Sequence, residues 1–137
     1  MKKLKKKVWQ LTTKKKMPTD SEKKLITLAF CDIVDDFRQK FIPKEPDRKY
    51  NYVIDIFSKW HRNFFYLCER FKSEHPDRIA DEFDSPFVRL EYLDKDSFTF
   101  SYLRHTGSWH IVDQRISSNE CKDLILSNPN FQPLPIA

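Results

Sequence analysis

The sequence predicts an α+β fold, in which an N-terminal amphipathic helix packs on an antiparallel meander of about five strands and a short C-terminal helix follows. Three observations support this prediction. Apolar residues recur at intervals of three and four over 19–41, which is helical spacing. From Tyr50 onward the period changes to two, and β-branched and aromatic residues dominate. A second short helical pattern begins at Ser117.

The first helix should begin at a capping box, because Thr19 is followed three residues later by Glu22. It is expected to run to about Phe41, and Pro43 stops it. Charged residues fill the opposite side, so the helix should lie on an apolar surface. Its apolar positions are Ile26, Phe30, Ile33, Val34, Phe37 and Phe41.

The strands should pair in chain order, because three of their four connections are short enough for hairpins. The long connection, 72–85, is expected to contain a helical turn at 77–83. After the strands, Ser117 and Glu120 form a second capping box, and a helix should run to about Ser127 with Cys121 turned inward. The expected strands are 50–57, 63–71, 86–93, 97–105 and 108–113.

Strand alternation divides the predicted sheet into two faces. A mixed face is typical of a partly solvated sheet, and its opposite charges fit cross-strand pairs. A second interpretation makes it a binding surface for a base or an acidic peptide, with Tyr66 available for stacking. The apolar face, under the first helix, should hold Tyr52, Ile54, Ile56, Leu67, Val88, Leu90, Tyr92, Phe98, Phe100, Tyr102, Trp109 and Ile111. The mixed face should hold Asp55, Tyr66, Cys68, Arg70, Arg89, Glu91, Thr99, Ser101 and His110, with Val53, Phe57 and Leu103.

Length and composition fit one domain with a substantial core. The chain has 137 residues, of which 39% are hydrophobic and 15% aromatic. We expect a basic arm over 1–18, a single α+β domain over 19–128 and an extended Pro-containing tail over 129–137. There is no apolar run of transmembrane length, and no apolar segment of a signal peptide follows the first lysines, so a cytoplasmic protein is expected.

Several classes of site are disfavoured by the residue types present. Gly107 is the single glycine, which excludes Gly-rich phosphate loops. The three cysteines lie far apart without CxxC spacing and are expected to be reduced and buried. The histidines form no HxH, HxxxH or HExxH pair, so neither a metal nor another cofactor is expected. These residues are Cys31, Cys68 and Cys121, and His61, His75, His105 and His110.

Positive charge is concentrated at the N-terminus. The chain has a net charge of +5, but residues beyond 16 hold 17 basic and 20 acidic side chains. The arm has three interpretations: a solubilising flexible terminus, an anchor for nucleic acid or another polyanion, and a short helix on an anionic membrane or a partner. Its eight lysines are Lys2, Lys3, Lys5, Lys6, Lys7, Lys14, Lys15 and Lys16.

These features favour a non-catalytic binding module that is attracted to a polyanion or nucleic acid through the arm. Trp60 and Arg62 are further candidate binding residues, because they lie at the predicted tip of the first hairpin. An exposed Trp beside cations can stack on a base or form an interaction hot spot. The alternative is that Trp60 folds back under a helix, since Trp is highly buried on average.

Two other functions remain open at this stage. The first is a small hydrolase with a site near His105 and Arg104, where Asp77 or Glu82 could orient the imidazole for general-base catalysis. Polar loop residues that merely solvate a sheet end explain the same pattern, and no GxSxG motif accompanies it. The second is a protein–protein interaction subunit, including a homodimer, that pairs through an apolar sheet face or edge.

Overall fold

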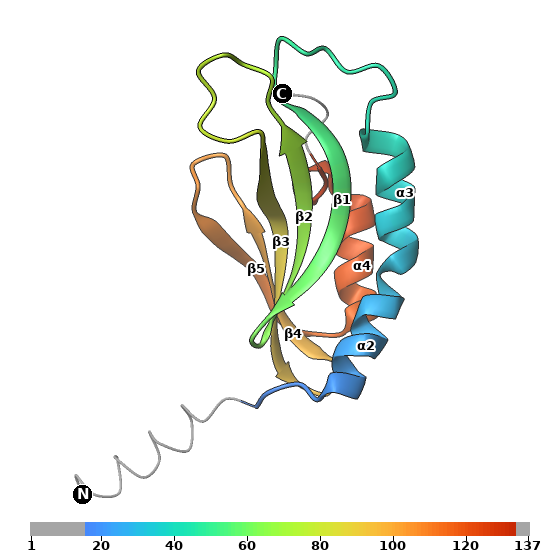
Figure 1. Cartoon of the computed structure of the whole chain (residues 1–137). Coiled ribbons are helices and arrows are strands. Elements are labelled where there is room, and N and C mark those ends of the chain that lie inside the picture. The colour runs from blue at the N-terminus through green and yellow to red at the C-terminus, as the bar shows by residue number, and fades with distance from the viewer. Residues whose placement is uncertain (1–15, 134–137) are drawn as a thin grey trace, which may run out of the picture.

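Three helices lie on one side of a twisted five-stranded sheet in the computed structural model (Figure 1), which describes residues 16–133. The predicted α+β fold with an antiparallel meander and a short C-terminal helix is therefore confirmed. In chain order the elements are α2 (Asp20–Ala29), α3 (Cys31–Phe41), β1 (Tyr52–His61), β2 (Phe64–Lys72), β3 (Glu82–Asp94), β4 (Ser97–Leu103), β5 (Trp109–Ile116), α4 (Ser118–Ser127) and the 3₁₀ helix η1 (Pro129–Phe131).

Both predicted capping boxes are present. The Thr19 hydroxyl accepts the Glu22 N–H at 3.1 Å, and the Glu22 carboxylate accepts the Thr19 N–H at 3.1 Å. Ser117 and Glu120 make the same reciprocal pair at the start of α4, at 3.1 and 3.2 Å. Each box satisfies two N–H groups that a helix start would otherwise leave unbonded, so local sequence fixes where α2 and α4 begin.

The single helix expected over 19–41 is divided into two at Phe30. This residue has φ −100° and ψ −1°, and its N–H bonds to the carbonyls of both Ile26 and Thr27. The Thr27 hydroxyl donates to the Lys23 carbonyl at 2.8 Å, a bond that often bends helices. The break keeps Phe30 fully buried against the sheet, with its ring centroid 5.2 Å from that of Phe65.

The sheet order is β1-β2-β3-β4-β5, and every neighbouring pair is antiparallel. With a single glycine in the chain, two of the three tight turns use other residues at positive φ. Arg62 has φ 54° between β1 and β2, Asp96 has φ 48° between β3 and β4, and Gly107 has φ 85° between β4 and β5. The meander places the β1–β2 and β3–β4 turns at one end of the sheet and the β2–β3 and β4–β5 connections at the other (Figure 1).

The helical turn expected at 77–83 is wrong: no helix forms over 77–81, and β3 already begins at Glu82. Pairing between β2 and β3 continues to this point through matched side chains. The rings of Phe71 and Phe83 stack at 5.3 Å, and Arg70 forms an ion pair with Asp84 at 2.8 Å. These cross-strand contacts favour the strand over a local turn.

The core lies between the helices and the covered face of the sheet. As predicted, Ile26, Phe30, Ile33, Val34 and Phe37 are the buried positions of the two N-terminal helices. They pack with sheet residues in one cluster that also includes the inner side of α4. The sheet contributes Val53, Ile56, Phe65, Leu67, Phe71, Phe87, Val88, Leu90, Tyr92, Phe98, Phe100 and Ile116.

Two strands differ from the predicted division of faces. In β1, Val53 joins the core in place of Ile54, because the register shifts between Val53 and Asp55. In β5, Trp109 and Ile111 pair with Leu103 and Ser101 and lie on the open face, whereas both were expected in the core. In β1 the irregularity adds one residue and exchanges the two faces of the strand, whereas in β5 the face is set by the pairing of Trp109 with Leu103 across the turn. Alternation within a single strand reveals neither.

The C-terminal segment and the cysteines also differ from expectation. Pro129–Phe131 form η1 instead of extended chain, and the Phe131 ring packs 5.1 Å from that of Phe100. The rest of the predicted tail, 134–137, lies outside the described residues, as does most of the arm. Cys68 and Cys121 are buried, but Cys31 is exposed, and all three are free thiols. None of the helices within 16–133 has the length and apolar character needed to cross a bilayer.

Candidate functional site

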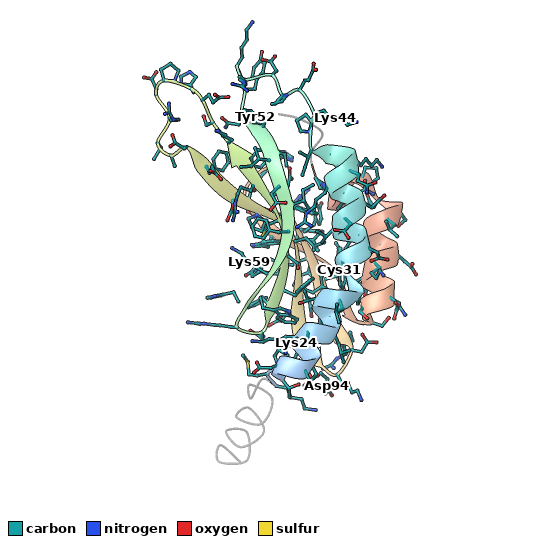
Figure 2. All side chains as sticks on the ribbon, turned by 45° about the vertical axis from the view of Figure 1, so that its right-hand side comes forward. Lys24, Cys31, Lys44, Tyr52, Lys59 and Asp94 are labelled. Carbon is teal, nitrogen blue, oxygen red and sulfur yellow. The ribbon has the colours of Figure 1, made fainter. Side chains whose placement is uncertain are left out.

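The face of the sheet opposite the helices is the more distinctive surface of the molecule. Helices α2, α3 and α4 all lie on the same side (Figure 1), and within residues 16–133 no helix covers the other side. Figure 2 shows the labelled Lys59 extending from that uncovered side, away from Cys31 and Lys24 on the helices. We refer to this uncovered side as the open face.

Four residues of the open face form a compact group of rings around one guanidinium, which we call the open-face cluster: Phe64, Tyr66, Arg89 and Trp109. The Arg89 guanidinium carbon lies 5.0 Å from the Phe64 ring centroid and 4.5 Å from that of Trp109. The Tyr66 ring centroid is 6.1 Å from that of Phe64 and 6.0 Å from that of Trp109. All four side chains are half-buried.

The cluster assembles because its members occupy outward positions on three strands. Tyr66 in β2 pairs directly with Arg89 in β3, so both side chains leave the same face. Arg89 in turn pairs with Ser101 in β4, whose small side chain is buried at 2% exposure. Trp109 begins β5 opposite Leu103. Because Ser101 is small, the rings of Tyr66 and Trp109 come together across the two strands between them.

Arg89 and Arg70 both lie against aromatic rings, but they differ in whether a carboxylate pairs with the guanidinium. Arg70 makes two hydrogen bonds to Asp84, at 2.8 and 3.3 Å, and stacks 4.8 Å from the Phe57 ring. This guanidinium holds the pKa of Asp84 below its ordinary value. Arg89, by contrast, forms no ion pair with any carboxylate among residues 16–133. Its position is set by aromatic faces, and its N–H donors have no acidic partner there.

Further cations lie around the cluster. Lys59 is on the open face of β1, beside Tyr66 in register, and Arg62 is exposed in the β1–β2 turn. In the described part of the chain neither one has an ion pair. The described chain begins at Lys16, whose ammonium bonds to Asp94 at 3.0 Å beside the β3–β4 turn. The basic arm therefore joins the body at the same end of the sheet as Arg62.

The other predicted binding residues are placed differently. Trp60 is half-buried on the covered side, where its indole N–H donates to the Lys23 carbonyl at 3.3 Å and the Thr27 hydroxyl at 3.2 Å. Its ring packs 5.1 Å from that of Phe65, so it lies under α2 and not in the open-face cluster. The arm residues Lys2, Lys3, Lys5, Lys6, Lys7, Lys14 and Lys15 lie outside the described residues.

Sequence reasoning missed Trp109 as a site residue because it assigned this side chain to the core. A signal was present in the β4–β5 turn. If Leu103 and Trp109 are opposite each other across that turn, they share a face, as the structure shows. Alternation along the strand over 97–105 assigns Leu103 to the mixed face. Pairing of Leu103 with Trp109 across the turn therefore assigns Trp109 to the mixed face as well.

A second candidate region is a cavity at the far end of the sheet, with a volume of about 530 Å³. Arg104 and His105 line it, as the hydrolase hypothesis required. Asp77 and Glu82 do not line it; Asp77 instead donates its N–H to His75 Nδ1 at 3.1 Å. The carboxylate at this cavity is Glu69, which is 3% exposed and had not been singled out. The remaining lining residues are Ser85, Pro86, Phe87, Tyr102, Leu103, Gly107, Pro129, Asn130 and Gln132.

Metal and thiol chemistry find little support in the described residues. No group of three or more His, Cys, Asp and Glu side chains within 16–133 is arranged to hold a metal ion. Burial raises the pKa of Cys68 to about 11, so its thiol stays protonated at neutral pH. Burial raises the pKa of Cys121 still further. The two buried cysteines are thus packing residues with little thiolate character.

Comparison with known proteins identifies the family and no relative of known function. Neither the curated proteins nor the solved structures contain a match to this sequence. One family profile matches residues 20–130, a span that runs from the start of α2 into η1 and includes the whole sheet. The chain belongs to the family described as Domain of unknown function (DUF3024).

Proposed function

We propose that this protein is a non-catalytic binding module for nucleic acid. In this proposal the open-face cluster makes the contact, and the Lys-rich arm adds attraction to the phosphate backbone. The observation that supports it most directly is Arg89, which is held between the rings of Phe64 and Trp109 while forming no ion pair among the described residues.

The geometry around Arg89 suits an anionic ligand. A guanidinium presents its N–H donors in a planar fork that matches phosphate oxygens. The flanking rings restrict the side chain before any ligand arrives, so less conformational entropy is lost on binding. Lys59 on the same face and Arg62 in the adjacent turn add positive charge.

The arm fits the same ligand. Eight lysines lie within residues 1–16 without an acidic residue, whereas the rest of the chain has more acidic than basic side chains. Lysines that neutralise phosphates release counterions, which makes the affinity strongly salt-dependent. Attraction should therefore be confined to the arm and the open face, with the remaining surface contributing little.

Fluorescence anisotropy with labelled oligonucleotides tests this proposal on the full-length chain. We expect binding at low salt that weakens steeply as salt rises, and a shallower salt dependence when Lys2, Lys3, Lys5, Lys6, Lys7, Lys14, Lys15 and Lys16 are all replaced by Gln. Arg89→Met should weaken binding at every salt concentration. Lys24→Gln is the matched control, because Lys24 is an exposed cation on α2, away from the open face.

The proposal is rejected if the full-length protein binds no oligonucleotide at low salt. It is also rejected if Lys24→Gln weakens binding as much as Arg89→Met, because the open face would then have no special role.

The cavity beside His105 supports a second candidate, a small hydrolase. His105 and the buried Glu69 line one cavity, which also contains the Tyr102 and Arg104 side chains. This candidate predicts hydrolysis of chromogenic esters or phosphate esters that His105→Ala abolishes while leaving the thermal unfolding midpoint unchanged. Lack of activity in the wild-type protein on both substrate classes would count against it.

A further inference from the structure

We infer that the open face binds single-stranded nucleic acid, with an unpaired base stacked on Trp109 and a neighbouring phosphate on Arg89. This inference rests on the proposed function and specifies its ligand. Electrostatic attraction alone treats single strands and duplexes alike as anions, whereas aromatic rings contact bases only where the base faces are accessible.

The arrangement of the rings is the first argument. Phe64, Tyr66 and Trp109 form a row with successive centroid separations of 6.1 and 6.0 Å, and their planes are tilted by 37° and 55°. Tilted rings do not cover one another. The stacked pair Phe71 and Phe83, at 15°, shows the other arrangement, in which each ring covers the other. The three rings are thus not covered by one another, and all three residues are partly exposed.

The position of Trp109 is the second argument. It is the first residue of β5, which is an edge strand beside β4 in the sheet formed by residues 16–133. Arg89 lies 4.5 Å from its ring centroid, and Tyr66 approaches it at a tilt. Trp109 is half-buried in the described structure, so part of this residue is accessible to solvent. Trp and Tyr rings stack on bases of any sequence, because every base has a π-face.

Charge is the third argument, and it selects nucleic acid over an uncharged aromatic ligand. Arg89 lies between two of the rings, and Lys59 lies in register beside the third. A stacked base on Trp109 would bring its own phosphate near the Arg89 donors. Alternating stacking and phosphate contacts are the common feature of surfaces that bind single strands.

A direct comparison of ligands provides the test. Full-length protein is titrated with a labelled single strand of about 12 nucleotides, with the duplex of the same length and with heparin, at one fixed salt concentration. We expect the single strand to bind about tenfold more tightly than the duplex, and its binding to quench indole fluorescence. In Trp109→Phe the quenching should fall, while most of the affinity remains.

Trp109→Ala distinguishes the contribution of base stacking to the affinity from the contribution of charge. It should weaken single-strand binding by about tenfold and leave duplex and heparin binding nearly unchanged. Leu126→Ala is the matched control, because Leu126 is an exposed apolar residue of α4, on the side opposite the open face, and is 54% exposed; we expect it to leave every affinity unchanged. Should Trp109→Ala fail to fold by circular dichroism, Tyr66→Leu removes the adjacent ring and takes its place.

The outcomes distinguish this inference from the proposed function. Equal affinity for single strand and duplex, or equal effects of Trp109→Ala and Leu126→Ala, overturns the single-strand inference and leaves a general polyanion module. Binding of poly-glutamate as tightly as the single strand also overturns it and indicates an acidic protein partner. Absence of binding to every anion overturns the proposed function itself.

Discussion

The covered and open faces of the sheet both use aromatic residues, but they use them in opposite ways. Under the helices, Phe65, Phe98 and Phe100 are completely buried. On the open face, the rings of the open-face cluster are only half-buried and surround Arg89. Phe65 and Tyr66 are consecutive residues of β2, so one step along the chain separates a core ring from a surface ring.

This comparison separates the aromatic residues that stabilise the fold from those that remain partly exposed. A fully buried aromatic side chain removes on the order of 150–250 Å² from water and contributes strongly to folding. A half-buried ring on a solvated face contributes less, and its exposed surface remains available for a ligand. Substitutions on the two faces should therefore have very different effects on unfolding and on binding.

The largest expected difference is between Phe65→Ala and Tyr66→Ala. Phe65 is 0% exposed and packs against both Phe30 and Trp60. Its removal should lower the free energy of unfolding by about 3–5 kcal/mol. Tyr66→Ala should lower it by roughly 1 kcal/mol, as for most partly exposed positions. Urea denaturation of both variants gives the two values, and equal losses would contradict the assignment of stability to the covered face.

An intermediate effect is expected for Tyr92→Phe, which removes a hydroxyl that joins the sheet to α2. The Tyr92 hydroxyl donates to the Glu22 carboxylate at the start of α2. This hydrogen bond raises the pKa of Tyr92 to about 12 and, together with the Thr19 N–H, lowers the pKa of Glu22. Tyr92→Phe should cost about 1 kcal/mol at neutral pH, from the lost hydrogen bond.

The pH dependence of that effect follows from the direction of the Glu22 shift. A carboxyl whose pKa is lower in the folded state stabilises the fold fully above its unfolded pKa, and it loses this contribution as pH falls through the folded pKa. Denaturation at pH 7, 4 and 3 should show the Tyr92→Phe difference shrinking with acid. Tyr50→Phe, at an exposed tyrosine, is the control and should show no change.

The smallest stability effect is expected for Arg89→Met. Each cation–π contact at a solvated site is worth about 0.5–1 kcal/mol, and the methionine stem still packs between the rings. The free energy of unfolding should change by less than about 1 kcal/mol, while oligonucleotide affinity falls. A loss as large as that of Phe65→Ala would instead make the open-face cluster a structural element, and the contrast between the two faces would fail.

Local patterns were sufficient for most of the fold. The capping boxes at Thr19 and Ser117 mark true helix starts, because their bonds join residues three apart. The change of period after Tyr50 correctly indicated five strands, and the short connections correctly indicated a meander. Strand ends were less accurate, since β3 begins at Glu82, where pairing with β2 outweighs the local turn preference.

The candidate site was only partly predictable. Tyr66 and Arg89 were assigned to the mixed face, and they are there. Trp109 was assigned to the core, because alternation within a strand does not show which residue lies opposite it across the β4–β5 turn; direct pairing with Leu103 places Trp109 on the open face. The location of the sheet-end cavity beside Arg104 and His105 was predicted, but the contributions of Glu69 and η1 were not, since these meet there from distant parts of the chain.

The amino-acid sequence alone determined the helix starts, the number and order of the strands and the concentration of lysines at the N-terminus, because these depend on neighbours a few residues apart. Only the tertiary structure decided that Trp109, Phe64 and Tyr66 meet around Arg89. That meeting depends on the register of four strands, and in a sheet a shift of one residue moves a side chain from one face to the other.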